Sequence, residues 1–346
     1  MADIHPSTDS AARMAFRAAH NLLRYSRIGS TDAVEFTEQI CDWNFVFTQL
    51  KPGKLTAKGA LLELDGISVG SIEISQTMLH QGHAPRGMVA ILIPGANSGE
   101  VFAHAQRLES GQCVTLSEGA YLEAVTHGRY VDVALGCDRD ACRAQLDALN
   151  DGSTGVGQGA IIAEPGQEWI EQMLARIDWL LSAVVERPAA LDDAKIRASL
   201  SDHLLAAMVH FDSSPADVDS TTRMDRASRR VAVRIAREFI DSRLSEPLRL
   251  SELCRQAQLK IRSLEYGFRE VTGLTPIAYI RSLRLNAVRR ALLHDATARC
   301  RSISEIAMDA GFWHLSQFAK DYRLFFGETP TQTRRRGHER MSTLQS

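Results

Sequence analysis

The sequence lacks the features that place a protein in a membrane or outside the cell. It has no run of about 18 apolar residues, and its N-terminus carries an early acidic residue, Asp3, where a secretory signal would have an apolar core. Its six cysteines, at positions 41, 113, 137, 142, 254 and 300, are scattered and form no Cys-x-x-Cys pair. We therefore expect reduced, inert thiols in a cytoplasmic protein that makes no membrane contact.

Sequence signatures of catalysis and of cofactor binding are also absent. There is no P-loop, no G-x-G-x-x-G and no G-x-S-x-G turn. His80 and His83 stand three apart in "LHQGHAPRG", a loop-like spacing that makes poor strand-borne metal ligands. The sequence thus predicts no catalytic residue, no metal and no cofactor, and it favours a binding protein over an enzyme.

What the sequence does have is a strong separation of charge. Its 346 residues are enough for two domains, and the formal net charge is only -2. Residues 221–346, however, hold 24 of the 40 Lys and Arg residues and only 13 of the 42 Asp and Glu residues. A basic C-terminal third on an acidic body predicts a polyanionic partner for that third, and nucleic acid is favoured over a merely solvated basic surface.

The order of the segments follows this charge separation. We expect a β-rich effector-sensing domain with a leading helix over residues 1–165, helices that connect or dimerise over 166–211, a Ser- and Asp-rich linker over 212–224, an all-helical domain over 225–337 and a tail over 338–346. Within the helical domain a short helix, a tight turn and a second helix occur twice, at 253–268 and 306–322. Two such helix-turn-helix units joined by one long helix, on a basic domain, predict a DNA-binding module.

The helical period then separates core positions from surface positions. Ile261, Leu264, Phe268 and Val271 share one face of the first unit, and Leu315, Phe318, Tyr322 and Phe325 share one face of the second unit. The opposite faces carry side chains that donate hydrogen bonds to base edges and phosphates or pack on thymine methyl groups. The candidate DNA-binding residues are Lys260, Arg262, Ser263, Tyr266, Arg269, His314, Ser316, Gln317, Lys320 and Arg323.

These segments resemble the DNA-binding domain of the AraC/XylS family of bacterial transcription regulators. The resemblance rests on "SLEYGFREVTGLTP" and "ISEIAMDAGFWHLSQFAKDYRLFFGETP", in which G-L-T-P and G-E-T-P follow the two recognition helices. It implies that both recognition helices enter successive major-groove segments of double-stranded DNA, about 34 Å apart. It also implies RNA polymerase as a partner and a bacterial cytoplasm as the location. Lys260 stands where the family usually has Ser, so this helix start lacks its usual cap.

The N-terminal part alternates apolar and polar residues between glycine-bounded turns. Segments such as "MVAILIP", "CVTL" and "YVDVALG" predict short antiparallel strands from about 54 to 136, and residues 31–50 are expected to form a helix that begins near Asp32. With the family resemblance, the expected fold is α+β: a cupin-like antiparallel β-barrel with helices, followed by an all-α domain of two helix-turn-helix motifs.

The barrel is the expected site of a small-molecule effector. "STDAVEFTEQICDWNFVFTQLKPGK" and "LLELDGISV" resemble regulators of ethanolamine-utilisation operons, which implies an amine effector and a role as activator of a catabolic operon. A cupin-type metal enzyme fused to a DNA-binding domain is the alternative. An amine requires an acceptor carboxylate or an aromatic face. The candidate effector-binding residues are Trp43, Glu63, Glu73, Tyr121, Glu123 and Asp132.

A last pattern lies in the segment 167–185. Its apolar residues step by four and three, as in a coiled-coil seam. Two and a half heptads leave two interpretations open, packing on the barrel and contact in a homodimer. The residues of this seam are Ile170, Leu174, Ile177, Leu181 and Val184.

Overall fold

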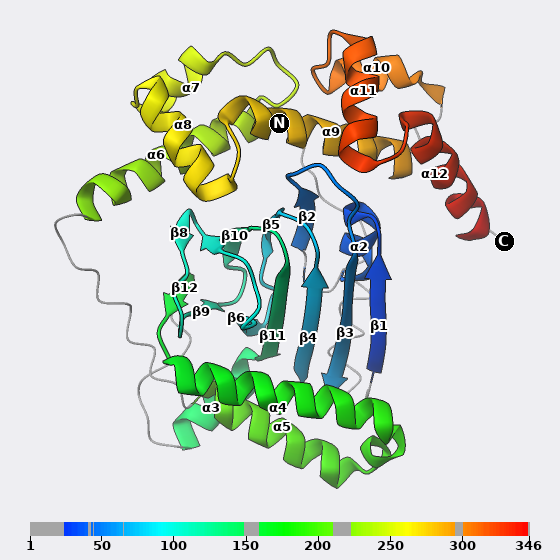
Figure 1. Ribbon diagram of the computed structural model, residues 1–346. Coiled ribbons are helices and arrows are strands. Elements are labelled where there is room, and N and C mark those ends of the chain that lie inside the picture. The colour runs from blue at the N-terminus through cyan, green and yellow to red at the C-terminus, as the bar shows by residue number, and fades with distance from the viewer. Residues whose placement is uncertain are drawn as a thin grey trace.

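The computed structural model describes residues 24–40, 43, 45–64, 66–148, 159–209, 223–294 and 300–344. It consists of a sheet-rich N-terminal part and a helical C-terminal part that lies across one end of it (Figure 1). The expected combination of β-rich and all-helical halves is therefore present. Across these described ranges, no helix combines the length and the apolar character that crossing a membrane requires.

The N-terminal part contains two antiparallel sheets. Its strands are β1 (Arg24–Ser30), β2 (Phe45–Gln49), β3 (Ala57–Leu64), β4 (Ile67–Ile74), β5 (Met78–His83), β6 (Met88–Pro94), β7 (Val101–Ala103), β8 (Gln106–Arg107), β9 (Cys113–Leu116), β10 (Tyr121–Thr126), β11 (Tyr130–Asp138) and β12 (Ala160–Ala163). The larger sheet has the order β1-β3-β4-β11-β6-β9-β12, and the smaller one has the order β2-β5-β10-β7-β8.

The expected closed barrel is corrected to two facing sheets. Phe47 and Leu122 of the smaller sheet share a buried core with Ile74 and Ala90 of the larger one. No described strand is hydrogen-bonded to strands of both sheets. The edge strand β8 has only two residues, so the ladder of the smaller sheet stops there and cannot continue into the other sheet.

The expected helix over 31–50 is only partly present. Helix α2 (Ala33–Gln39) begins where predicted, because Asp32 accepts a hydrogen bond at 2.9 Å from the backbone N–H of Val34. The second half of the segment forms strand β2, in which Phe45 and Phe47 are buried and Val46 is 39% exposed. This alternation has the period of a strand, and pairing with β5 decides the outcome.

Three longer helices accompany the larger sheet. They are α3 (Arg139–Ala148), α4 (Gln167–Glu186) and α5 (Ala194–Val209), with a 3-10 turn over Pro188–Asp192. On α4, Ile170, Ile177 and Val184 are buried against Val69 and Leu135 of the sheet. Leu174 and Leu181, the other two residues of the predicted seam, are partly buried against the same core. The seam thus packs on the chain's own sheet, and a dimer contact through it would have to remove these side chains from the core.

The C-terminal part is helical, as expected. Its helices are α6 (Arg223–Ser242), α7 (Leu250–Ala257), α8 (Ile261–Thr272), α9 (Pro276–His294), α10 (Ile303–Asp309), α11 (Leu315–Phe326) and α12 (Pro330–Leu344). The pairs α7–α8 and α10–α11 are joined by α9 (Figure 1). The predicted core positions of both units are buried or partly buried except Ile261, which is 52% exposed. The expected linker lies mostly outside the described residues, which begin again at residue 223.

Helix α6 buries a different face from the one that apolar spacing suggests. Val231 and Ile235 are exposed by 46% and 37%, whereas Val233, Ala236 and Arg237 are buried. The buried face joins a hydrophobic core that contains residues of both parts of the chain, which we call the shared core. It includes Leu50, Leu79, Phe102, Ala105 and Val125 of the N-terminal part together with residues of α6 to α9. The two parts are therefore packed together and are not separate bodies.

Candidate nucleic-acid interface

The second helix pair has well-defined ends. Ser302 caps α10 by accepting from the backbone N–H of Glu305, and Glu305 in turn accepts from the backbone N–H of Ser302, so the two residues form a capping box. Gly311, with φ +87°, makes the turn that leads to α11, and Gly327, with φ +74°, ends that helix. These local signals fix where the recognition helix candidate begins and ends.

The outer face of α11 carries all five predicted residues of this unit. His314, Ser316, Gln317, Lys320 and Arg323 are exposed, while Phe318, Tyr322 and Phe325 hold the helix in the core. The exposed set combines donors, acceptors and positive charge on one surface, which is the chemistry that contacts DNA bases and phosphates.

The first helix pair presents a similar surface. Lys260 stands at the N-cap of α8 and, as expected, its side chain makes no capping hydrogen bond. Lys260, Arg262, Tyr266 and Arg269 are exposed, and Ser263 is half-buried. The guanidinium of Arg229 on α6 lies 5.0 Å from the centre of the Tyr266 ring, which holds the ring in place on the surface.

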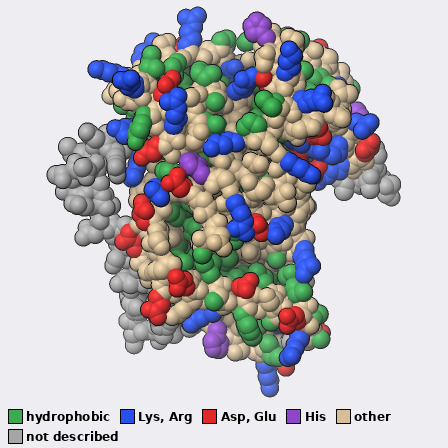
Figure 2. Space-filling view, viewed as in Figure 1, with side chains coloured by type: hydrophobic (Ala, Val, Ile, Leu, Met, Phe, Trp, Pro, Cys, Tyr) green, Lys and Arg blue, Asp and Glu red, His purple; other side chains and the backbone are tan. Residues whose placement is uncertain are grey.

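The basic side chains gather on the helical end of the molecule. Figure 2 shows Lys and Arg most densely over the C-terminal helices, in the same view as Figure 1. This surface holds the exposed residues of α8 and α11. The position of the charge on the folded chain therefore agrees with its position in the sequence, and the polyanion-binding surface is expected there.

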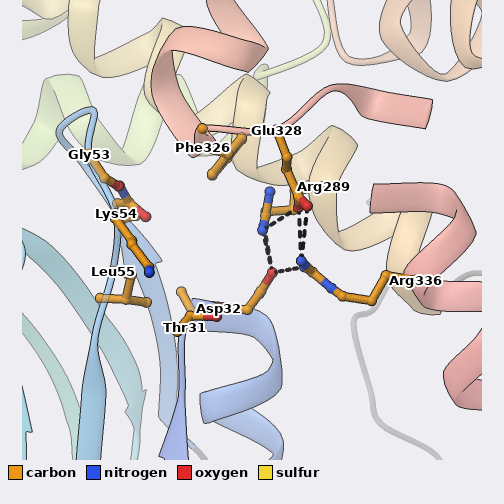
Figure 3. A pocket seen from close by; sticks show the side chains of 12 residues that line it. Thr31, Asp32, Gly53, Lys54, Leu55, Arg289, Phe326, Glu328 and Arg336 are labelled. Carbon is orange, nitrogen blue, oxygen red and sulfur yellow. Dashed lines mark hydrogen bonds and ion pairs between the residues drawn. The ribbon is translucent and has the colours of Figure 1, made fainter. Parts of the chain in front are cut away.

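A buried ion cluster connects the helical part to α2. Asp32, at the N-cap of α2, places Oδ2 2.6 Å from Nη2 of Arg289 on α9 and 2.6 Å from Nη2 of Arg336 on α12. Oε1 of Glu328 lies 2.8 Å from Arg289 Nη2 and 3.0 Å from Arg336 Nη1. Asp32 and Arg289 are 1% and 4% exposed. Figure 3 shows the acidic and basic groups converging from the two parts of the chain.

This ion cluster borders a cavity of about 250 Å³. Lys54 and Leu55 line the cavity from the N-terminal part, and Phe326 lines it from the end of α11 (Figure 3). The guanidinium of Arg289 lies 4.2 Å from the centre of the Phe326 ring. The charges at this point of the interface are paired with one another, so the cluster links the N-terminal and C-terminal parts through buried ion pairs.

A second buried ion pair lies over the smaller sheet. Nη1 of Arg237 on α6 is 3.0 Å from Oε1 of Glu123 on β10, and Nε of Arg237 donates to the hydroxyl of Tyr279 at 3.2 Å. The amide of Gln81 donates to Glu123 at 3.3 Å and to Asp241 at 3.4 Å. Burial raises the pKa of Asp241 to about 6. Glu123, predicted as an effector acceptor, is instead engaged with the helical part.

The other candidate effector residues lie in three different places. Trp43 is buried in the core between the sheets. Glu73 is on the surface, 2.8 Å from Nζ of Lys58 and 3.0 Å from Nε of Arg129. Glu63 is half-buried on β3, and Tyr121 is 42% exposed beside Gln81. The structure therefore does not bring the six residues together in one site.

Asp132 has the surroundings that a ligand-binding carboxylate would have. It lies on β11, where Val133 and Leu135 face the core that contains α4. Because successive side chains of a strand alternate between the two faces, the side chain of Asp132 points to the opposite face, between the sheets. Burial raises its pKa to about 7, and its Oδ1 has no hydrogen-bond partner among the described residues. The neighbouring ring of Tyr130 lies 5.3 Å from that of His80, whose pKa burial lowers to about 3.

The arginines at the interface were not found by sequence reasoning. A basic domain predicts Arg residues that face solvent or DNA, yet Arg237 and Arg289 are buried in contact with carboxylates of the N-terminal part. Asp32 was predicted only as a helix cap. The one available signal is the position of Arg237 among Val233, Ala236 and Ile240 on the buried stripe of α6. Within the described ranges, no three His, Cys, Asp or Glu side chains are grouped so as to hold a metal ion.

Residues 253–336 match the sequence model of the helix-turn-helix domain family. The matched segment begins in α7 and ends in α12, so it contains both helix pairs and the connecting helix α9. The C-terminal part of the chain is therefore a helix-turn-helix domain, as the sequence pattern predicted.

The relatives of this domain are transcription regulators. The chain is 44% identical over 98 residues to a XylDLEGF operon transcriptional activator of Pseudomonas putida. The aligned residues make up 28% of this chain and 30% of that protein. It is 31% identical over 100 residues to a probable thc operon regulatory protein of Rhodococcus erythropolis. The aligned residues make up 29% of this chain and 30% of that protein. The chain thus spans about three tenths of the length of these curated relatives. By their descriptions the first is an operon transcriptional activator and the second a probable operon regulatory protein.

Two solved structures align with the chain at low TM-scores. A probable AraC family transcriptional regulator from Rhodopseudomonas palustris is 30% identical and covers 31% of this chain and 97% of its own, with a TM-score of 0.29. The AraC-like transcriptional activator CuxR is 14% identical and covers 82% of this chain and 100% of its own, with a TM-score of 0.36. At these scores neither alignment bears on the arrangement of the whole chain.

Proposed function

We propose that the protein is a sequence-specific DNA-binding activator of transcription from a catabolic operon, controlled by a small-molecule effector. The observation that carries the proposal is the surface of the helix-turn-helix domain, where two helix pairs expose basic and amide side chains on a domain that is 44% identical to that of an operon activator. Double-stranded DNA and RNA polymerase are the expected macromolecular partners in a bacterial cytoplasm.

The DNA contacts are expected to follow the two exposed helix faces. In this proposal the pairs α7–α8 and α10–α11 are two helix-turn-helix motifs, and α8 and α11 enter successive segments of the major groove. Arg262 and Lys320 are expected to contact the DNA directly. Arg269 and Arg323 lie nearer the helix ends and suit phosphate contacts. The proposed boundaries are 1–165 for effector sensing, 166–211 for the connecting helices and 225–337 for DNA binding.

Replacing Lys320 by alanine is expected to weaken DNA binding, because the ammonium group stands exposed on the outer face of α11. If it contacts a phosphate, binding to all sequences should weaken alike and the salt dependence should fall by about one counterion; a base contact should relax one position of the site by about 1–3 kcal/mol. Titration of selected duplexes at two salt concentrations measures both effects. Arg335→Ala, which removes an exposed charge from α12, is the matched control. Unchanged affinity of Lys320→Ala at both salt concentrations would reject its role.

The effector is proposed to be an amine or amino alcohol that binds between the two sheets. Asp132 is the acceptor best suited to an ammonium group, because its side chain is buried and its Oδ1 lacks a partner among the described residues. Trp43 belongs to the same interior and offers an aromatic face. Binding there would bias the packing of the sheets against the helical part, and so alter how the DNA-binding surface is presented. A homodimer is also proposed, without a defined contact.

Ethanolamine is expected to bind the wild-type chain with an affinity that rises about tenfold from pH 6 to pH 8. The ammonium pairs with the ionised carboxylate, and with a pKa of about 7 the Asp132 carboxyl is mostly protonated at pH 6 and mostly ionised at pH 8. Calorimetry with ethanolamine, acetate and glucose provides the measurement. Asp132→Asn should abolish binding, whereas Glu73→Gln, which alters a surface carboxylate, should retain it. Heat from acetate or glucose and none from ethanolamine would remove the amine assignment and leave the DNA-binding proposal intact.

A further inference from the structure

The side chain of Gln317 is held by a neighbour one turn later on α11. Its Nε2 donates a hydrogen bond of 2.8 Å to Oδ1 of Asp321. The other carboxylate oxygen of Asp321 pairs with the guanidinium of Arg281 on α9. The Asp321 side chain is 11% exposed, whereas Gln317 lies on the exposed face of the helix. We call this chain of contacts, Arg281 to Asp321 to Gln317, the Gln317 relay.

The relay determines which end of the Gln317 amide faces outward. An ionised carboxylate accepts hydrogen bonds and cannot donate them, so Gln317 can meet Asp321 only through its NH₂ group. The carbonyl Oε1 then remains available, together with the second N–H of the same NH₂ group. Arg281 approaches Asp321 from a different helix, so the carboxylate is fixed by the tertiary packing of α9 against α11 as well as by its own helix.

We propose that Gln317 reads an adenine in the major groove and that Asp321 and Arg281 are positioning residues that set this preference. This inference rests on the proposed DNA-binding function. Adenine presents a donor, N6–H, to Oε1 and an acceptor, N7, to the remaining N–H, which gives two hydrogen bonds. Guanine presents two acceptors, so its O6 would oppose Oε1. Thymine presents an acceptor and a methyl group, and cytosine offers only one donor.

The relay also has an electrostatic consequence that separates it from an ordinary contact. Asp321 places a negative charge on a helix that is proposed to face phosphates, which by itself opposes DNA binding. Removing Asp321 is therefore expected to raise the affinity for DNA in general and to lower the selectivity for adenine at one position.

The test is a selection of binding sites from a random-sequence duplex library by the full chain, followed by titration of the single-base variants of the selected site. In the wild type, one position should prefer adenine over guanine by about 5- to 150-fold. Gln317→Ala should remove the preference at that position only. Asp321→Ala should reduce it by about fivefold, because the amide can then also turn its NH₂ group toward guanine. Arg281→Ala should reduce it less, because Asp321 still accepts from Gln317 but is no longer held by α9. For Asp321→Ala, overall affinity should be equal to or higher than that of the wild type.

The matched control is Asp309→Ala. Asp309 is the last residue of the neighbouring helix α10 and pairs with Arg301, which precedes that helix, so its removal changes the net charge equally without touching the relay. It should leave all base preferences unchanged. The proposal is overturned if Gln317→Ala loses no position, if the lost position prefers a base other than adenine, or if Asp321→Ala weakens all duplexes alike. A wild-type chain that selects no sequence at all would instead refute the proposed function.

Discussion

Replacing Asp32 by alanine is expected to lower the free energy of unfolding by about 3–5 kcal/mol, because it leaves Arg289 buried and without its principal partner. Asp32 also caps α2, and loss of that cap alone costs about 1 kcal/mol. Asp32→Asn separates the two effects, since asparagine retains a capping oxygen but not the charge. Unfolding of the full chain in urea provides the measurement.

The control for Asp32 is an ion pair that joins the same two parts of the chain at the surface. Glu38 pairs with Arg340 and lies 2.7 Å from His294, and its side chain is 40% exposed. Because solvent screens such a pair, Glu38→Ala should cost no more than about 1 kcal/mol. If Asp32→Ala is no more destabilising than Glu38→Ala, the buried ion cluster does not fasten the two parts together.

Replacing Phe318 by alanine is expected to destabilise the second helix pair by about 3–5 kcal/mol. The ring is 3% exposed and packs between Phe312, at a centroid distance of 5.0 Å, and Tyr322, at 5.7 Å. The cavity left behind would loosen the face of α11 that carries Ser316 and Lys320, so DNA binding should be lost as well. Thermal unfolding and duplex titration of the full chain measure the two effects.

Leu324→Ala is the matched control for Phe318. Leu324 lies on the same helix and is 74% exposed, so truncating it should change the stability by less than about 0.5 kcal/mol. The proposed binding of ethanolamine between the sheets should be the same in both variants as in the wild type. If Phe318→Ala retained the wild-type stability, the assignment of this side chain to the core would be wrong.

The helical half of the molecule was largely predictable from sequence because its signals are local. The capping box at Ser302, the stop at Gly327 and the spacing of Phe318 and Tyr322 depend only on residues within a few turns of one another. The proposed DNA-contacting residues follow from the same helical period, since whatever does not face the core faces outward.

The contacts between the two halves were not predictable in this way. Arg237 and Glu123 are 114 positions apart, and no local sequence pattern around either residue predicts that the two form an ion pair. The second half of the segment 31–50 carries β-favouring residues such as Phe45, Val46 and Phe47, and pairing with the distant strand β5 completes the strand. The same reason applies to α6, where the apolar Val231 and Ile235 are exposed and the opposite face of the helix packs in the shared core.

The shared core bears on any attempt to build hybrid regulators. The identity to the XylDLEGF operon activator covers 98 residues, and the helix-turn-helix match covers residues 253–336, which invites exchange of that segment between proteins. In this chain, however, Leu264 and Phe268 of α8 share a buried core with Leu79 and Phe102 of the smaller sheet. A transplanted C-terminal segment therefore has to match the shape of the recipient's sheet at these positions. In a hybrid whose two surfaces do not match, apolar side chains of the interface would be exposed to water.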